Sequence, residues 1–240
     1  MKLPAKTPWF FTMSIALFCS GTVLAAPPQR VTVEYDMSHN GTAMAQVVET
    51  MQHDGKRYVL ESEVKGKGLF ALARSGSAKR SSVGEVTPSG LRPNEFRDRR
   101  GDRPENVARF NWAKGSLSQG EAGRTDAQPM PALEQGASLS DRLSFLWSFA
   151  FSPPQGKEVR ALLSDGRGLS TFRYAIAGNE VLKTPAGDID TVKLVKQRDA
   201  GDDRGTEIWL ASRRGFIPVR ILVIEKDGTR IDQMVTRMGS

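Results

Sequence analysis

The sequence contains very little cysteine and histidine. One of its 240 residues is a cysteine, Cys19, and two are histidines, His39 and His53. Cys19 lies in an N-terminal segment that we expect to be removed, so the mature protein has no thiol for a disulfide, a metal site or a nucleophile. Both histidines lie beside predicted hairpin turns, and they lack the spacing of zinc ligands. We therefore predict no metal site.

Motifs that carry common enzyme chemistry are also missing. There is no Gly-x-Ser-x-Gly elbow and no phosphate-binding P-loop. Gly66–Ala71 matches a loose dinucleotide fingerprint, but its apolar run ends at Arg74, too early for the helix that would receive a pyrophosphate. The acidic group of Asp199, Asp202 and Asp203 lacks the spacing of an EF-hand loop. We predict a non-catalytic protein with no cofactor and no catalytic residue, and a hydrolase built from acidic residues distant in sequence is a third alternative.

The sequence has a single long apolar run, and it lies near the N-terminus. Two lysines precede this run, Trp9–Cys19, and small residues follow it. This is the layout of a cleavable secretory signal peptide. We predict cleavage between Ala25 and Ala26, which gives a signal peptide over 1–25 and a single β-rich domain over 26–240. The mature protein is then periplasmic and has no stable transmembrane anchor.

The chain is basic. Its formal charge of +7 falls to +5 when Lys2 and Lys6 leave with the signal peptide. This balance favours contact with anionic lipid headgroups or acidic partners, and a nucleic-acid partner is not expected of an exported protein. The densest basic run supplies the predicted anion contact, formed by Arg97, Arg99 and Arg100, because alternate arginines on a strand share one face and can grip a phosphate or carboxylate. The acids interleaved with them favour a plain solvated surface instead.

Hydrophobic alternation predicts an all-β fold. Apolar residues at every second position of Val31–Met37 indicate a half-buried strand, and Asn40-Gly41 after it suits a tight hairpin turn. Similar patterns predict strands throughout 31–119 and 157–238, separated by a loop over 120–137. About a dozen consecutive antiparallel strands favour a strongly curved sheet or barrel, because a flat sheet of that size leaves exposed edges.

A single apolar α-helix is predicted over 139–151, and we expect the sheet to wrap around it. Ser138 or Ser140 can cap its start, and Pro153-Pro154 ends it. A helix that is apolar on nearly all sides must be buried, either as an ordinary core helix or as a plug that lines a ligand cavity. The residues predicted to form this apolar ligand site or core are Phe145, Leu146, Phe149, Trp112 and Trp209.

Several stretches resemble a known family, among them VEYDMSHNGTAMA, LSDRLSFLW and VLKTPAGDIDTVKL. The most specific are Gly90-Leu91-Arg92-Pro93 and the segment from Trp209-Leu210 to Pro218-Val219-Arg220. In content and order they are similar to an exported proteobacterial family, number 3108 among the domains of unknown function, over nearly the whole mature chain. That resemblance implies no established activity. More loosely, a long meander around a helix is similar to the half-barrels that carry lipoproteins across the periplasm, which is an analogy of fold alone.

Two functions follow as hypotheses. The first is a periplasmic binding or carrier protein for an apolar or amphipathic envelope ligand, such as a lipid or a lipoprotein. The alternative is a cell-envelope interaction module with a packed interior, which binds an envelope protein or a polysaccharide through its basic surface.

The signal-peptide hypothesis predicts the N-terminus of the mature protein. We expect protein recovered from the periplasm to begin at Ala26 when its N-terminus is sequenced. Ala25→Gln should block this processing, because signal peptidase requires a small residue at that position. Recovery of the wild-type chain from the cytosol with residues 1–25 still attached would contradict the prediction.

Overall fold

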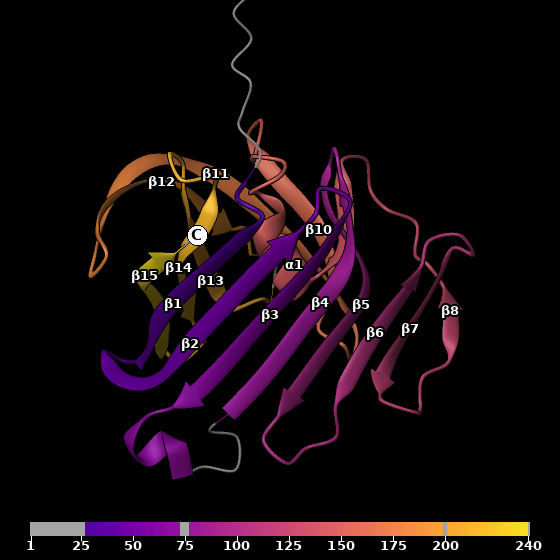
Figure 1. The fold of residues 1–240 in the computed structure, drawn as a ribbon, viewed down its shortest axis with the longest axis horizontal. Helices are drawn as coiled ribbons and strands as arrows, with labels where there is room; N and C mark the ends of the chain where they lie inside the picture. The colour runs from indigo at the N-terminus through magenta and orange to yellow at the C-terminus, as the bar shows by residue number, and fades with distance from the viewer. Residues whose placement is uncertain (1–26, 73–76, 199–200, 240) are drawn as a thin grey trace, which may run out of the picture.

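The structure is a computed structural model that describes residues 27–72, 77–198 and 201–239, most of them in the strands of one sheet (Figure 1). The predicted signal peptide and its cleavage point lie outside the described residues. The first eight strands are β1 (Arg30–His39), β2 (Thr42–His53), β3 (Arg57–Gly66), β4 (Ser77–Thr87), β5 (Gly90–Arg100), β6 (Asn106–Asn111), β7 (Ser116–Glu121) and β8 (Ala127–Pro129). The others are β9 (Ala137–Asp141), β10 (Glu158–Ser164), β11 (Leu169–Thr184), β12 (Gly187–Lys196), β13 (Gly205–Ala211), β14 (Ile217–Ile224) and β15 (Arg230–Gly239). A 3₁₀ helix, η1 (Gly68–Leu72), follows β3, and an α-helix, α1 (Arg142–Ser148), follows β9.

The first and last strands of the described residues lie side by side in the middle of the sheet. Strands β1 to β8 run outward in sequence order and form what we call the first arm. The chain then crosses to the opposite edge, and β9 to β15 return to the middle as the second arm, so that β15 pairs with β1. The prediction of an all-β, strongly curved sheet is confirmed, with fifteen strands in the described residues rather than about a dozen.

One strand pair departs from the predicted antiparallel meander. β9 and β10 pair in parallel, with Leu139 opposite Leu162. Parallel neighbours need a crossover between them, and α1 lies in that connection. The helix therefore belongs to a β–α–β unit at the edge of the second arm.

Local sequence explains the first hairpin. Val31, Val33 and Tyr35 alternate along β1 and are all buried, with at most 4% of each residue exposed. Asn40 and Gly41 take positive φ angles of 49° and 81° at the turn into β2. Two successive positive φ angles give the hairpin turn whose twist matches the flanking strands, so the turn predicted from these two residues is confirmed.

The helix is shorter than the predicted 139–151. Residues 137–141 are a strand instead, because they pair with β10. Asp141, rather than Ser138 or Ser140, is the N-cap, and its carboxylate accepts hydrogen bonds from the backbone N–H groups of Leu143 and Ser144. After Ser148 the chain continues as turns up to the two prolines. Among the described residues, no helix has both the length and the apolar character needed to cross a membrane.

The expected loop over 120–137 is also more ordered than predicted. It contains the end of β7, the three-residue strand β8 and the first residue of β9. β8 pairs with β7 through three residues, Ala127 to Pro129, all of them exposed. A short edge strand that ends in proline offers little backbone for pairing with another chain.

The two arms face each other along a line that we call the seam, where β9 lies against β5 and no backbone ladder of the described residues joins the arms. β8 and β9 end the sheet on opposite sides, and side chains join the arms instead. Ser164 Oγ donates to Gln119 Oε1 at 2.9 Å, which links β10 to β7. The backbone N–H of Leu91 on β5 donates to Ser148 Oγ of α1 at 2.8 Å. Figure 1 shows α1 between the two arms.

The space around α1 is mostly filled by side chains. Trp147 of the helix is 1% exposed, and Tyr35, Tyr58 and Phe96 of the first arm are equally buried. Phe145 packs on the other side, against Leu163, Tyr174 and Ile208 of the second arm. The centre of the curved sheet is therefore a packed core.

A glycine at a close backbone approach provides a test of this packing. A Cβ added at Gly84 on β4 would lie 2.1 Å from the carbonyl oxygen of Arg92 and 2.9 Å from the ring of Tyr58. We expect Gly84→Ala to lower the free energy of unfolding by about 1–3 kcal/mol, as overpacking does. The measurement is urea unfolding followed by tryptophan fluorescence.

Gly168→Ala is the matched control. No atom lies within 4 Å of a Cβ at that position, and its φ angle is not positive. Its free energy of unfolding should stay within about 1 kcal/mol of the wild type. Equal midpoints for the two variants would contradict the close approach at Gly84.

Candidate functional site

A buried carboxylate joins α1 to the first arm. Asp141 is fully buried, and its Oδ1 accepts the N–H groups of Leu143 and Ser144, each at 2.8 Å. Its Oδ2 accepts the hydroxyl groups of Ser82 on β4, at 2.6 Å, and of Ser144, at 2.8 Å. Burial raises the pKa of Asp141, and these hydrogen bonds act in the opposite direction. One side chain thus caps the helix and fixes it across the seam.

A second buried carboxylate holds the other end of the helix. Glu49 on β2 is 4% exposed. Its Oε2 accepts the indole N–H of Trp147 at 2.8 Å, and its Oε1 accepts the hydroxyl of Ser62 at 3.1 Å. Burial raises the pKa of Glu49, although these two hydrogen bonds and the positive charge of Arg80 lower it. Each buried oxygen has a partner, as stability requires.

A cavity opens beside the C-terminal end of α1, where β5 approaches β9. Its volume is about 640 Å³. Its apolar wall consists of Leu91, Trp112, Leu139, Phe145 and Phe149. Its polar rim includes Ser89, Arg92, Ser138, Gln155, Glu158 and Arg160. We call it the seam cavity. A mixed lining of this kind suits an amphipathic molecule better than a purely apolar one.

Trp112 is held rigidly in this wall. Its indole N–H donates to the carbonyl oxygen of Pro93 at 2.8 Å. Its ring stacks on that of Phe110, with centroids 5.8 Å apart and planes 9° apart. The guanidinium of Arg92 lies 5.7 Å from the ring centroid on the rim. The wall is preorganised, so a ligand does not have to order it.

Gly90 allows a close approach of β5 to α1 beside the seam cavity. This residue has a φ of 110°, and a Cβ there would lie 2.0 Å from Ser148 Oγ. Because glycine has no Cβ, the hydroxyl of Ser148 can come close enough to accept a hydrogen bond from the N–H of Leu91. A glycine at this turn therefore lets β5 come close to α1 beside the cavity.

The structure brings together three of the five predicted apolar residues. Trp112, Phe145 and Phe149 line the seam cavity. Leu146 points to the opposite side of α1, where it lines a second cavity with Phe145. Trp209 lies apart from both cavities on β13, 3% exposed. Its indole N–H donates to Glu180, and Lys193 and Arg220 lie 4.7 and 4.6 Å from its ring centroid.

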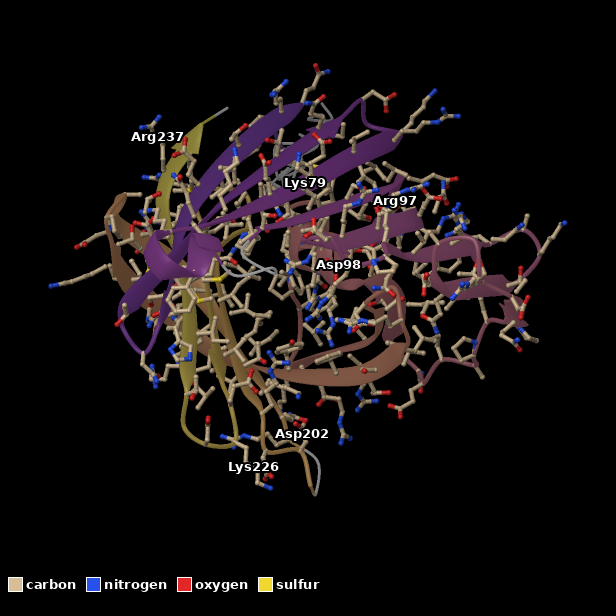
Figure 2. All side chains as sticks on the ribbon, turned by 90° about the horizontal axis from the view of Figure 1, so that it is seen from below. Lys79, Arg97, Asp98, Asp202, Lys226 and Arg237 are labelled. Atoms are coloured by element: carbon tan, nitrogen blue, oxygen red, sulfur yellow. The ribbon has the colours of Figure 1, made fainter. Side chains whose placement is uncertain are left out.

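The three arginines of the predicted anion contact do not share a face. Arg97 and Arg99 point outward from β5, and both bind Glu105, at 2.8 and 3.5 Å. Arg97 also binds Glu95 at 2.7 Å. Arg100 points inward and binds the buried carboxylate of Asp98 at 2.7 Å. Figure 2 shows Asp98 on the inner side of the first arm, beneath Arg97. Each guanidinium already has a carboxylate partner.

Sequence reasoning missed that Glu49 and Asp141 are buried and hold α1. A usable signal was present, because the inward positions of β2 read Ala45, Val47, Glu49 and Met51. A carboxylate in an otherwise apolar row must find a partner inside the protein. Asp141 gave no such signal, since its role depends on the strand that replaces the start of the predicted helix.

The two carboxylates that hold α1 are not available to a ligand of the seam cavity. Neither Asp141 nor Glu49 lines the seam cavity, and the oxygens of both are occupied by the hydrogen bonds that hold α1. In the described part of the chain, no three histidine, cysteine or acidic side chains are grouped so that they could hold a metal ion. The arrangement can bind and orient a molecule.

Comparisons with known proteins agree with the fold. A sequence profile for DUF3108, described as a protein of unknown function, matches residues 32–236. No curated protein matches the sequence. A solved β-barrel-like protein of the unknown-function domain DUF1849 from Brucella abortus is similar, with a TM-score of 0.53 and 7% identity over 89% of this chain and 98% of that chain. A DUF1329 family protein from Desulfovibrio piger aligns with a TM-score of 0.27 and 11% identity, over 88% of this chain and 85% of that one.

The buried carboxylate of Glu49 predicts a pH effect. Its pKa is higher in the folded protein than its ordinary 4.5, so the folded state holds this proton more tightly. The contribution of Glu49 to the free energy of unfolding therefore falls as pH rises from about 4.5 through the raised pKa, and is constant above it. Glu49→Gln should remove this fall, as measured by urea unfolding at a series of pH values.

Two further variants complete this test. Glu61→Gln, on an exposed site of the neighbouring strand, should keep the wild-type dependence on pH. Glu49→Ala should lower the free energy of unfolding by about 2–4 kcal/mol, because it leaves a buried indole N–H without an acceptor. A pH profile of Glu49→Gln identical to that of the wild type would show that Glu49 does not titrate as proposed.

Proposed function

This chain belongs to the DUF3108 family of proteins of unknown function, and we propose that it is an exported, non-catalytic binding or carrier protein. In this proposal the ligand is an apolar or amphipathic molecule of the cell envelope, a lipid or the lipid part of a lipoprotein, and it occupies the seam cavity.

The seam cavity is the observation that carries the proposal. Its volume of about 640 Å³ lies within the ~300–1,000 Å³ of small-molecule sites. Five large apolar side chains form its wall, and charged groups stand at its rim. A lipid-like molecule can bury its apolar part against such a wall while its polar part stays near the rim and water.

The packed core supports a ligand position beside the helix rather than inside the sheet. Trp147, Tyr35 and Tyr58 fill the centre, so a ligand there would have to displace well-packed aromatic side chains. The seam has no backbone ladder within the described residues, and side chains close it. Small movements of β9 or the turn after α1 can therefore admit a ligand at lower cost than opening a ladder.

Export is supported by the N-terminal sequence. Two lysines, an apolar run and small residues precede Ala26, in the order that a signal peptidase substrate requires. A chain without any thiol after cleavage is also suited to an oxidising compartment, where it must be stabilised by burial alone.

The alternative function is an envelope interaction module, and the packed core is the observation that favours it. Arg97 and Arg99 lie on the outer face of the first arm, 41% and 61% exposed in their side chains. Their pairing with acids weakens their use for a further anion, although a protein partner can exchange such pairs. A salt-sensitive pull-down of an envelope protein, lost in Arg97→Ala/Arg99→Ala, would favour this function over the carrier.

Filling the seam cavity tests the carrier function. Ala137→Trp on β9 introduces an indole into the cavity, and we expect binding of the neutral probe N-phenyl-1-naphthylamine to weaken about tenfold. Ala127→Trp on the edge strand β8 is the matched control and should bind the probe as the wild type does. Fluorescence titration measures both.

The natural ligand requires a second measurement. Wild-type protein purified from its own periplasm should carry lipid adducts in native mass spectra, and Ala137→Trp should carry fewer. Wild-type protein without adducts that also fails to bind the probe would rule out the carrier function.

A further inference from the structure

A second cavity lies on the other side of α1, against the second arm. Its volume is about 400 Å³. Much of its wall is apolar and is formed by Leu146, Phe172, Ile208, Ile221 and Val223. Its charged lining consists of Arg142, Lys196, Arg204 and Asp202. We call it the basic cavity. Among these four residues the cations outnumber the carboxylate by two, and Glu225 beside the cavity neutralises part of that surplus by pairing with Arg204.

Arg142 differs from the other two cations of this cavity in its partners. Its guanidinium lies 5.6 Å from the ring centroid of Phe172. It forms no hydrogen bond or ion pair with a side chain in residues 27–72, 77–198 or 201–239. Burial lowers the pKa of Arg142; the negative charge of Asp165 opposes this effect, and the positive charges of Arg204 and Arg100 add smaller decreases. The environment of this side chain therefore favours an added negative charge.

The other two cations are held in place by partners that only partly neutralise them. Lys196 is 9% exposed in its side chain, and its Nζ lies 2.6 Å from Asp202 Oδ2. The same Nζ lies 5.2 Å from the ring centroid of Phe172, so this ring holds two cations. Arg204 pairs with Glu225 at 3.0 Å and is half exposed. Lys196 and Arg204 are therefore positioned before any ligand arrives, which reduces the cost of binding.

Arg100 extends the positive potential to the first arm. It points into the same interior from β5, where Arg80 and Arg100 share the buried carboxylate of Asp98, at 3.2 and 2.7 Å. Figure 2 shows Asp98 on the first arm and Asp202 on the second, on opposite sides of the interior. Two cations on one acid again leave a positive surplus, and such a concentration of one sign attracts anions.

We infer that the basic cavity binds the phosphate group of an amphiphile, with its apolar part against the wall formed by Leu146 and Phe172. A phosphate monoester carries about −1.5 to −2 charges at neutral pH and can pair with Arg142, which has no acid partner of its own, and with the cations beside it. Guanidinium groups recognise phosphate oxygens through paired N–H donors. α1 separates this site from the seam cavity, so the inference does not depend on the proposed function, and the two sites are tested separately.

Titration of short-chain lipids against the mature protein tests this site. Dihexanoyl phosphatidic acid should bind more tightly than dihexanoyl phosphatidylcholine, and binding should weaken as salt is raised. Arg142→Gln should weaken phosphatidic acid binding about tenfold, since it removes a charge-assisted contact. Arg204→Gln should weaken it in the same direction. Isothermal titration calorimetry measures each affinity.

Two control measurements show whether a loss of affinity arises at the basic cavity. Arg92→Gln removes an arginine from the rim of the seam cavity and should leave phosphatidic acid binding unchanged. Arg142→Gln should in turn bind N-phenyl-1-naphthylamine as the wild type does, so loss of one site is distinguishable from loss of the other. Thermal unfolding near the wild-type temperature confirms that the variants are folded.

Inorganic phosphate distinguishes the two sources of the ligand group. Phosphatidic acid binding without phosphate binding supports a lipid headgroup that needs its apolar part. Binding of both, each weakened by Arg142→Gln, supports a phosphate site that does not need the lipid. Equal affinity for phosphatidic acid and phosphatidylcholine, or an unchanged affinity in Arg142→Gln, would overturn the inference.

Discussion

Two buried carboxylates close a sheet that its own backbone leaves open. The hydrogen bonds of a ladder would join β8 to β9 in a closed barrel, and here Asp141 and Glu49 connect the helix to the facing arm instead. Burying a carboxylate is costly, and the cost is offset only when its oxygens are fully hydrogen-bonded. Ser82, Ser144, Ser62 and the indole of Trp147 supply those bonds. The position of α1, and with it the shape of both cavities, depends on this arrangement.

Closure by side chains also accounts for the positions of the cavities. A ladder would bring the strands about 4.8 Å apart along the whole seam. A short helix cannot match that continuity, and space is left on both of its sides. The seam cavity lies beside Ser148 and Phe149, and the basic cavity beside Arg142 and Leu146. Phe145 contributes to both walls and is the side chain that separates them.

Local rules predicted most of the fold, and long-range pairing accounts for the differences. Alternation along β1 and the Asn40-Gly41 turn are local features, and the structure confirms them. The start of the predicted helix became β9 because residues 137–141 pair with β10, a partner that the sequence pattern does not specify. Of the residues predicted as an apolar ligand site or core, Trp112, Phe145 and Phe149 line one cavity, whereas Trp209 lies in the core with its ring beside Lys193 and Arg220. The sequence did not single out Arg142, because the residues that form the basic cavity with it are distant in sequence and come together only in the fold.

The pairing of β1 with β15 governs the order in which the molecule can assemble. Val33 lies opposite Met238, so the central ladder joins segments from the two extremes of the described chain. Contacts so remote in sequence slow folding, because a large loop must close before they form. Until β15 has been synthesised and has paired with β1, the backbone amide and carbonyl groups on that side of β1 have no strand partner. During synthesis, that unfinished edge is the surface on which a chaperone or a second nascent copy could act.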